Sequence, residues 1–497
     1  LAGHLRLHKL IVFWDNNNIT IDGTVDLTDS TDQKTRFEAS GWEVIEIDGH
    51  NPEEIDSAIS AAKKSEKPTM IACKTHIAIG TAAQDTSKGH GALTDPELIK
   101  NAREVYQWSH KPFDIPKSIK EQWEQAGLEG HKAFKRWQSK LENLSNSKRK
   151  EFERIFSGDA PKKLTSAIRK FKKESSAASP TIATRKSSEL TLNAINSFMQ
   201  ETIGGSADLT GSNNTKSNDM KIFDKNNRKG RYIHYGIREH AMAAAMNGMA
   251  LHGGIRPYGG TFMCFTDYAR PAMRLAALMK IPTIFVMTHD SIGLGEDGPT
   301  HQPVEHLAIS RSTPNTLVFR PADTIETAEC WEIALSMKNT PSVLALSRQN
   351  LPTVRQKHQF ANLVSKGAYI LEEASKNRRV ILIATGSEVS IALKARELLE
   401  DKGIGTRVVS MPCMELFSQQ DETYKRRILP AGQAIRIGIE AGVRTGWDEW
   451  LLGNRARANK SSFVGMKSFG ASAPAEVLFN HFGITPDRIA SEATNLL

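Results

Sequence analysis

The 497-residue sequence has few cysteines and no long apolar run, and each shortage excludes a class of protein. Its four cysteines, Cys73, Cys264, Cys330 and Cys413, lie far apart and form no Cys-x-x-Cys pair. This spacing excludes a zinc site built on thiolates and argues against a disulfide framework. No apolar run reaches the roughly 18–20 residues of a membrane span, so no membrane partner is expected. Residues 1–7 lack the features of a signal peptide, and a reducing cytoplasm is the expected location.

Positive charge exceeds negative charge by nine, and the excess is local. Residues 111–173 contain 17 basic and 8 acidic residues, whereas the rest of the chain balances at 48 against 48. A basic segment can bind nucleic acid. Here Phe134, Trp137, Leu141 and Leu144 recur at helical spacing, which favours charges on the solvated face of amphipathic helices. We therefore expect no nucleic-acid partner.

Strand-like and helical segments alternate along the chain. The sequence predicts strands at residues 9–14, 42–47 and 69–73, with a helix over 52–64 between the last two. It also indicates the end of a helix at residues 1–7. Further strands are expected at 283–288, 317–319, 343–347, 380–384, 407–410 and 436–440. Such alternation predicts parallel sheets covered by helices. We expect an α/β protein of three domains with mostly parallel sheets, the first truncated: residues 1–155, a linker over 156–180, residues 181–366 and residues 367–497.

An asparagine-rich loop over residues 15–23 follows the first expected strand. Loops at the carboxyl ends of parallel strands are where open α/β sheets bind ligands. Amide and carbonyl oxygens are suited to Mg²⁺ or Ca²⁺. The simpler interpretation is a turn, and the loop by itself leaves both open.

A second loop, residues 288–301, has the spacing Gly293-x-Gly295-x-x-Gly298 after a strand. This spacing matches the dinucleotide fingerprint, but Glu296 and Asp297 would place negative charge where the pyrophosphate binds. The two histidines of this loop, together with Glu296 and Asp297, suit proton transfer and the recognition of sugar hydroxyls. A plain glycine-rich connection is the alternative.

Two further patterns have a structural and a functional interpretation. Glu239 precedes a helix expected over 240–251, where a Glu is normally a capping charge; it would be catalytic only if buried against a ligand nitrogen. Phe262, Phe265 and Tyr268 recur at i, i+3 and i+6, a stripe more typical of a core than of a cofactor pocket.

Taken together, these segments resemble the transketolase family. The resemblance runs from Leu1 to Leu497 and rests on motifs in the family's order: Gly204-Gly-Ser-Ala-Asp208, His234-Tyr-Gly-Ile-Arg-Glu239, Gly293-Leu-Gly-Glu-Asp-Gly-Pro-Thr-His-Gln-Pro303, Leu346-Ser-Arg-Gln-Asn350, Ile383-Ala-Thr-Gly-Ser-Glu388 and Phe469-Gly-Ala-Ser-Ala-Pro-Ala475. It implies the thiamine diphosphate-binding fold and transfer of a two-carbon ketol unit from a ketose phosphate, such as xylulose 5-phosphate, to an aldose phosphate, such as ribose 5-phosphate. That reaction serves the pentose phosphate pathway and the Calvin cycle. A sister thiamine enzyme such as dihydroxyacetone synthase, or an inactive fragment, is the alternative.

The resemblance implies a thiamine diphosphate site between the subunits of a homodimer. Glu239 matches the residue that hydrogen-bonds N1′ of the aminopyrimidine and favours its imino tautomer, whose exocyclic nitrogen removes the C2 proton of the thiazolium. Asn17 and the carbonyl of Ile19 match two ligands of the Mg²⁺, with Ca²⁺ or Mn²⁺ as substitutes. The other matched cofactor contacts are Phe262, Phe265, Tyr268, Asp208 and His90.

A site for sugar phosphates is implied as well. Two guanidinium groups suit a phosphate because they can donate paired hydrogen bonds to its oxygens. The matched substrate contacts are Arg185, Ser212, His289, Asp297, His301, Arg348 and His90. Of these, His301 is a candidate for proton transfer and His90 matches a histidine near the reacting atoms.

Family members carry a further segment before the point matched by Leu1, and that segment supplies the third protein ligand of the metal. Since Mg²⁺ sheds its waters reluctantly without a carboxylate, we expect the 497 residues alone to bind the cofactor weakly.

Overall fold

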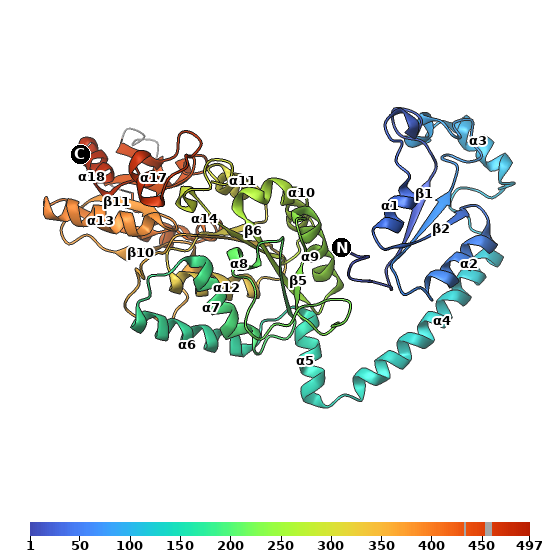
Figure 1. Ribbon diagram of the computed structural model, residues 1–497, viewed down its shortest axis with the longest axis horizontal. Coiled ribbons are helices and arrows are strands. Elements are labelled where there is room, and N and C mark those ends of the chain that lie inside the picture. The colour runs from blue at the N-terminus through green and yellow to red at the C-terminus, as the bar shows by residue number, and fades with distance from the viewer. Residues whose placement is uncertain (432–433, 453–459) are drawn as a thin grey trace. The chain divides into compact units, whose positions relative to one another are not determined.

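The computed structural model describes residues 1–431, 434–452 and 460–497, and it divides into two compact units. The first unit comprises Leu1–Ser145 with Asp224–Arg228, and the second comprises Asn146–Phe223 with Lys229–Leu497. Each unit is described by itself, and Figure 1 labels the elements of both. Among the helices of these residues, none has the length and apolar character needed to cross a membrane.

The first unit contains a three-stranded parallel sheet. Its order is β1 (Ile11–Asn16), β3 (Thr69–Lys74) and β2 (Glu43–Asp48). Central strand β3 is buried along most of its length and packs Ile71 against Ala58 and Ala62 of α2 (Pro52–Ala62). Helix α2 begins where Asn51 caps it by accepting from two backbone N–H groups. These strands and this helix confirm the expected β-α-β alternation.

One segment of the first unit agrees with expectation and another differs. Residues 1–7 are turns with the hydrogen bonds of a helix end, since the Leu5 N–H donates to the Leu1 carbonyl and the Leu7 N–H to the Ala2 carbonyl around Arg6, whose φ is +47°. The helix expected around Phe134 exists as α4 (Lys117–Glu142), but Phe134 and Trp137 on its apolar face are 53% and 49% exposed. The remaining helices of this unit are α1 (Gln33–Ala39) and α3 (Pro96–Val105).

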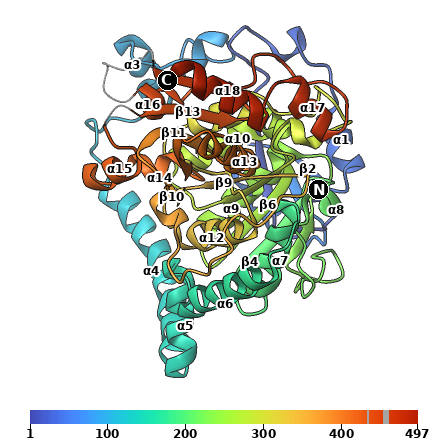
Figure 2. The same cartoon turned by 90° about the vertical axis from the view of Figure 1, so that its left-hand side faces the viewer.

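The second unit begins with a six-stranded sheet in which every strand pair is parallel. The order is β5 (Tyr232–His234), β4 (Thr202–Ser206), β6 (Arg256–Phe262), β7 (Ile284–Thr288), β9 (Ser342–Leu346) and β8 (Leu317–Phe319). Helices α6 (Lys162–Ala178), α7 (Thr184–Asn196) and α12 (Thr324–Ser336) pack together on this sheet, as Figure 2 shows.

Neighbouring residues of β6 show that helices cover both faces of this sheet. The Tyr258 ring packs edge-on against Trp331 of α12, with ring centroids 5.4 Å apart. A Cβ added at Gly259 would instead meet Met242 and Met246 of α9 (Glu239–His252). Because successive side chains of a strand point to opposite faces, α12 and α9 lie on opposite sides. Helix α10 (Thr266–Leu278) packs beside α9.

The linker expected over residues 156–180 is mostly helical and belongs to the core. After α5 (Asn146–Ser157), helix α6 buries Leu164 and Ile168 in the cluster that it shares with α7 and α12. Its serine- and alanine-rich end resembled a linker, but Ser175 and Ser176 are buried in helical turns. Small side chains here permit close helix packing. The other domain boundaries stay a prediction.

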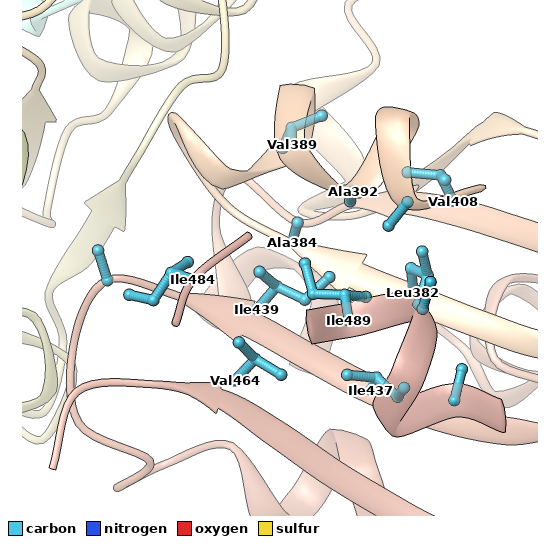
Figure 3. Packing of buried hydrophobic residues seen from close by; sticks show 14 of the residues in the cluster. Leu382, Ala384, Val389, Ala392, Val408, Ile437, Ile439, Val464, Ile484 and Ile489 are labelled. Carbon is cyan, nitrogen blue, oxygen red and sulfur yellow. The ribbon is translucent and has the colours of Figure 1, made fainter. Parts of the chain in front are cut away.

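The last part of the second unit is a five-stranded sheet. Its order is β10 (Tyr369–Glu372), β12 (Gly405–Ser410), β11 (Arg378–Ala384), β13 (Ile435–Glu440) and β14 (Ser461–Gly465), with β10 antiparallel and the other pairs parallel. Helices α13 (Glu388–Asp401) and α18 (Pro486–Leu496) pack on one face, where their aliphatic side chains meet those of β11 and β13 (Figure 3). The other face is covered by Phe417, Trp447 and Trp450 from α14 (Met414–Ser418), the turn before α16, and α16 (Asp448–Leu452).

Candidate active site

The carboxyl ends of the six-stranded sheet collect most of the predicted site residues. All six strands are parallel, so these ends share one edge, where open α/β sheets bind ligands. Asp208 follows β4, Glu239 follows β5, Phe262 ends β6, His289 follows β7 and Arg348 follows β9. The fold therefore brings together residues that lie as much as 140 positions apart in the sequence.

Glu239 is a nearly buried carboxylate at the start of α9. The residue is 9% exposed, and its side chain has no hydrogen-bond or ion-pair partner among the described residues. Its two oxygens still reach solvent, since neither is among the fully buried polar atoms that lack a partner. The first turn of a helix stabilises its charge in part, and its oxygens are free to receive a ligand's hydrogen bond.

An aromatic platform lies beside Glu239. The rings of Phe262 and Phe265 are parallel within 2°, with centroids 5.7 Å apart. Between them, burial raises the pKa of the Cys264 thiol to about 12, with smaller contributions from the Asp267 and Glu239 carboxylates. The sequence spacing suggested one helical stripe, but Phe262 ends a strand, Phe265 ends the turn η3 (Met263–Phe265), and the largely exposed Tyr268 lies in α10.

Two arginines flank a buried histidine at the neighbouring strand ends. Arg185 lies in the first turn of α7, which is tied to β9 because the Thr184 N–H donates to the Ser347 hydroxyl at 3.0 Å. The Arg185 guanidinium donates to the Ser212 carbonyl at 2.7 Å and lies 3.4 Å from Nε2 of His289. Burial, and then the nearby Arg348 charge, lower the pKa of Arg185.

His289 is held neutral by its surroundings. It adopts a left-handed φ of +62°, and its ring stacks on Phe262 with centroids 3.7 Å apart. Burial, followed by the charges of Arg185, Arg348 and His301, lowers the pKa of His289 to about 3. Two guanidinium groups beside a neutral imidazole form a site with an excess of donors, which suits an anion.

The glycine-rich segment after β7 forms turns rather than a dinucleotide site. Gly295 and Gly298 have φ values of +94° and +79°, and the next helix, α11 (His306–Arg311), begins too late to receive a pyrophosphate at its N-terminus. Asp297 is exposed in this segment, and His301 is half-buried, with its ring edge-on to Phe265 at 5.7 Å. The segment thus places His301 beside the aromatic platform, four residues after the exposed Asp297.

Three predicted site residues belong to the first unit. Asn17 and Ile19 follow β1, and the Asn17 side-chain oxygen accepts from the Ile19 N–H at 3.0 Å. His90 is exposed at the end of the turn η2 (Ser87–His90). No cluster of three His, Cys, Asp or Glu side chains that could hold a metal occurs within residues 1–431, 434–452 and 460–497.

Sequence reasoning missed four residues whose hydrogen bonds connect the segment after β7 with other parts of the chain. These are Asp290, Gln302, Arg320 and Ser472. Gln302 and Ser472 fall inside the motifs Gly293–Pro303 and Phe469–Ala475, which was a signal of their importance, whereas nothing in the sequence around Arg320 indicated its contacts.

The fold and the candidate site define a class: α/β proteins with a ligand site expected at the carboxyl ends of their strands. Comparison with known proteins identifies the family within this class. Three family descriptions match the chain: "Transketolase, thiamine diphosphate binding domain" over residues 1–161, "Transketolase, pyrimidine binding domain" over 180–354 and "Transketolase-like TK C-terminal domain" over 367–485. The chain belongs to the transketolase family.

Individual relatives agree. The transketolase of Rhodobacter capsulatus is 61% identical over 498 residues, covering 100% of this chain and 74% of that protein, and the transketolase of Sinorhizobium medicae is 52% identical, covering 100% and 70%. Among solved structures, transketolase from Leishmania mexicana has a TM-score of 0.91 at 38% identity, covering 100% of this chain and 72% of that one. The chain is an enzyme of the transketolase type, and these relatives do not favour dihydroxyacetone synthase.

Proposed function

We propose that Glu239 and the Phe262–Phe265 platform hold the aminopyrimidine of thiamine diphosphate. The observation that carries this proposal is the nearly buried Glu239 carboxylate, which has no protein partner in the described chain. A ring nitrogen that donates a hydrogen bond would satisfy it, and the parallel phenyl rings offer faces on which an aromatic ring stacks. The match of residues 180–354 to the pyrimidine binding domain of transketolase supports this fit.

The cofactor, when bound, supplies an electron sink for breaking the carbon–carbon bond of a ketose. The task of Glu239 is to hold or share a proton at the pyrimidine nitrogen. His301, edge-on to the platform, is the candidate to move a proton at a substrate oxygen, and His90 is proposed as a further catalytic residue from its match to the family.

Sugar phosphates are the proposed substrates. Arg185 and Arg348 bind the phosphate, and the neutral His289 donates or accepts one further hydrogen bond without adding charge. The proposed contacts to substrate hydroxyls come from Asp297 and His301. Ser212 is proposed to bind the phosphate with the two arginines, and Asp208 is proposed to lie near the thiamine. The two-carbon unit would pass from a ketose phosphate to an aldose phosphate.

The remaining elements follow the family. Asn17 and the Ile19 carbonyl are proposed as ligands of Mg²⁺, for which hard oxygen donors are suited. We also propose a homodimer with its active sites between subunits, and a cytoplasmic location with a role in the pentose phosphate pathway and the Calvin cycle.

The acceptor tests this function against its nearest alternative. The enzyme that contains this sequence is supplied with xylulose 5-phosphate, thiamine diphosphate and Mg²⁺, and with either ribose 5-phosphate or formaldehyde. We expect a seven-carbon sugar phosphate from the first acceptor at a much higher kcat/KM than dihydroxyacetone from the second. The reverse ranking would identify a dihydroxyacetone synthase.

A further inference from the structure

Residues 289–302, called here the substrate loop, carry three of the proposed substrate contacts: His289, Asp297 and His301. Apart from the short turn η4 (Ile292–Leu294), this loop has no regular structure. Its backbone takes positive φ at His289, Gly295 and Gly298. A loop without a hydrogen-bond ladder needs other partners to keep one conformation.

The C-terminal part of the loop is tied to the Phe469–Ala475 segment. Gln302 is 3% exposed, and its Nε2 donates to the Gly295 carbonyl at 2.8 Å and to the Ala471 carbonyl at 2.9 Å. The Ser472 hydroxyl donates to the carbonyl of Glu296. A Cβ added at Gly470 would lie 1.7 Å from Oε1 of Gln302, so only glycine permits this approach. The bonds from Gln302 to the Gly295 carbonyl and from Ser472 to the Glu296 carbonyl fix the two residues that precede Asp297.

The N-terminal part of the loop is tied to the turn between β11 and α13. Asp290, which follows His289, accepts from Nε of Arg320 at 2.9 Å. Arg320 is fully buried and donates to the Thr385 carbonyl at 3.0 Å and also to Glu388. At Gly386, whose φ is +53°, an added Cβ would lie 2.8 Å from Cζ of Arg320. The loop is therefore held directly by residues 471 and 472 near its C-terminal end, and through Arg320 by the turn after β11 at its N-terminal end.

We propose that the five-stranded sheet region, residues 367–497, positions the substrate loop for sugar recognition. Gln302, Ser472, Asp290 and Arg320 are the positioning residues, since each acts through the loop backbone or through a neighbour of His289. The inference rests on the proposed function, because it assigns the loop to substrate rather than to cofactor. Glu239 and Phe262 lie outside the loop, on α9 and β6.

This assignment predicts a separation between substrate and cofactor binding. Loss of either anchor lets Asp297 and His301 leave the geometry that the sugar needs, and small misplacements of positioned groups cost up to roughly 10²-fold in rate. His289 and His301 touch the rings of Phe262 and Phe265, but those rings are carried by β6 and η3 and Glu239 by α9, so we expect the affinity for thiamine diphosphate to be unchanged.

The test uses two loop variants, Gln302→Met and Ser472→Ala. Because Ser472 is exposed, Ser472→Ala does not put folding at risk, and Arg407→Met serves as the matched control. Arg407 is a buried arginine of β12 that pairs with Glu373 and has no bond to the loop. We expect KM for xylulose 5-phosphate to rise roughly tenfold in Gln302→Met and severalfold in Ser472→Ala, at an unchanged Kd for thiamine diphosphate. Arg407→Met should lower Tm and leave both constants alone.

Hydrogen exchange of residues 293–301 provides a readout that does not depend on activity. We expect faster exchange in Gln302→Met and Ser472→Ala, and wild-type exchange in Arg407→Met. Unchanged loop exchange and unchanged KM in both folded loop variants would overturn the inference. A higher KM, a higher Kd and a lower Tm in all three variants, Arg407→Met included, would overturn it as well. Faster loop exchange in an enzyme without thiamine-dependent transfer would refute the proposed function and leave the anchoring of the loop established.

Discussion

Arg185 and Arg348 lie close enough that the charge of one lowers the pKa of the other. Such repulsion between like charges is unfavourable in the free protein and is relieved when an anion binds between them. His289, neutral beside both, adds no third charge. At the scale of single residues, the site is therefore arranged for a phosphate.

Arg348→Ala tests this arrangement most cleanly, because Arg348 is exposed, whereas Arg185 also supports the Ser212 carbonyl. Loss of a charge-assisted contact worth about 1.5–3 kcal/mol should raise KM for ribose 5-phosphate roughly tenfold or more. Steady-state kinetics with an unphosphorylated acceptor, glycolaldehyde, should show little change. Equal losses with both acceptors would make the arginine structural.

The lowered pKa of His289 predicts a pH dependence of stability. The unfolded chain takes up a proton at His289 below about pH 6.5, while the folded chain resists it down to about pH 3. Stability linked to this group is therefore present above pH 6.5 and lost as the pH falls. From pH 7 to pH 5 the free energy of unfolding should drop by about 2 kcal/mol more in the wild type than in His289→Gln. Parallel curves from urea titrations would show that His289 is not buried as described.

Among the elements, helix α6 departs most from the sequence-based prediction. Lys172 on this helix is 2% exposed; its Nζ lies 2.5 Å from Glu329 of α12 and donates to the Ala361 carbonyl at 2.7 Å. Arg355 contacts the same carboxylate at 2.9 Å. A segment read as a linker thus carries a buried ion pair that joins three parts of the chain.

Lys172→Met should lower the free energy of unfolding by about 3 kcal/mol, because it leaves Glu329 buried with one cation fewer. Lys170→Met is the matched control, since Lys170 lies on the same helix with an exposed side chain. It should change stability by less than about 0.5 kcal/mol. Equal effects in urea denaturation would mean that α6 is not part of the core.

Whether a strand could be predicted from the sequence depended on its amino-acid composition. Strands β7, β8 and β11 were found because they are rich in β-branched and apolar residues. Strands β4 and β6 were missed, since Thr-Ile-Gly-Gly-Ser and Arg-Pro-Tyr-Gly-Gly-Thr-Phe contain residues that disfavour strands locally. Packing explains them: a Cβ at Gly204 would clash with Tyr258, and one at Gly259 with Met246.

For the site, the sequence indicated residues within motifs and missed contacts between distant segments. Glu239 and Arg348 were found through motifs, but the burial of Glu239 without a partner follows only from how α9 packs. The Arg320–Asp290 pair joins positions 30 residues apart, and neither local spacing nor composition marks it. The individual site assignments stay proposals.

At the scale of the whole molecule, the two sheets of the second unit share a buried ion network. Arg311 pairs with Glu440 at 2.7 and 2.8 Å, and Arg320 pairs with Asp290 and Glu388. Burial alone would raise the pKa of Glu440, but Arg311 and then Arg320 hold it at about 2. The two domains predicted over residues 181–366 and 367–497 stay a prediction, and this network joins their sheets within one compact unit.

The central claim, that the Glu239 carboxylate serves thiamine diphosphate in ketol transfer, is tested most directly by Glu239→Gln. The enzyme that contains this sequence is assayed for transfer from xylulose 5-phosphate to ribose 5-phosphate at saturating thiamine diphosphate and Mg²⁺, beside the exposed-carboxylate control Glu174→Gln. We predict that kcat falls on the order of 10²-fold or more in Glu239→Gln and stays at the wild-type value in the control. A Glu239→Gln enzyme with a wild-type kcat would contradict the account.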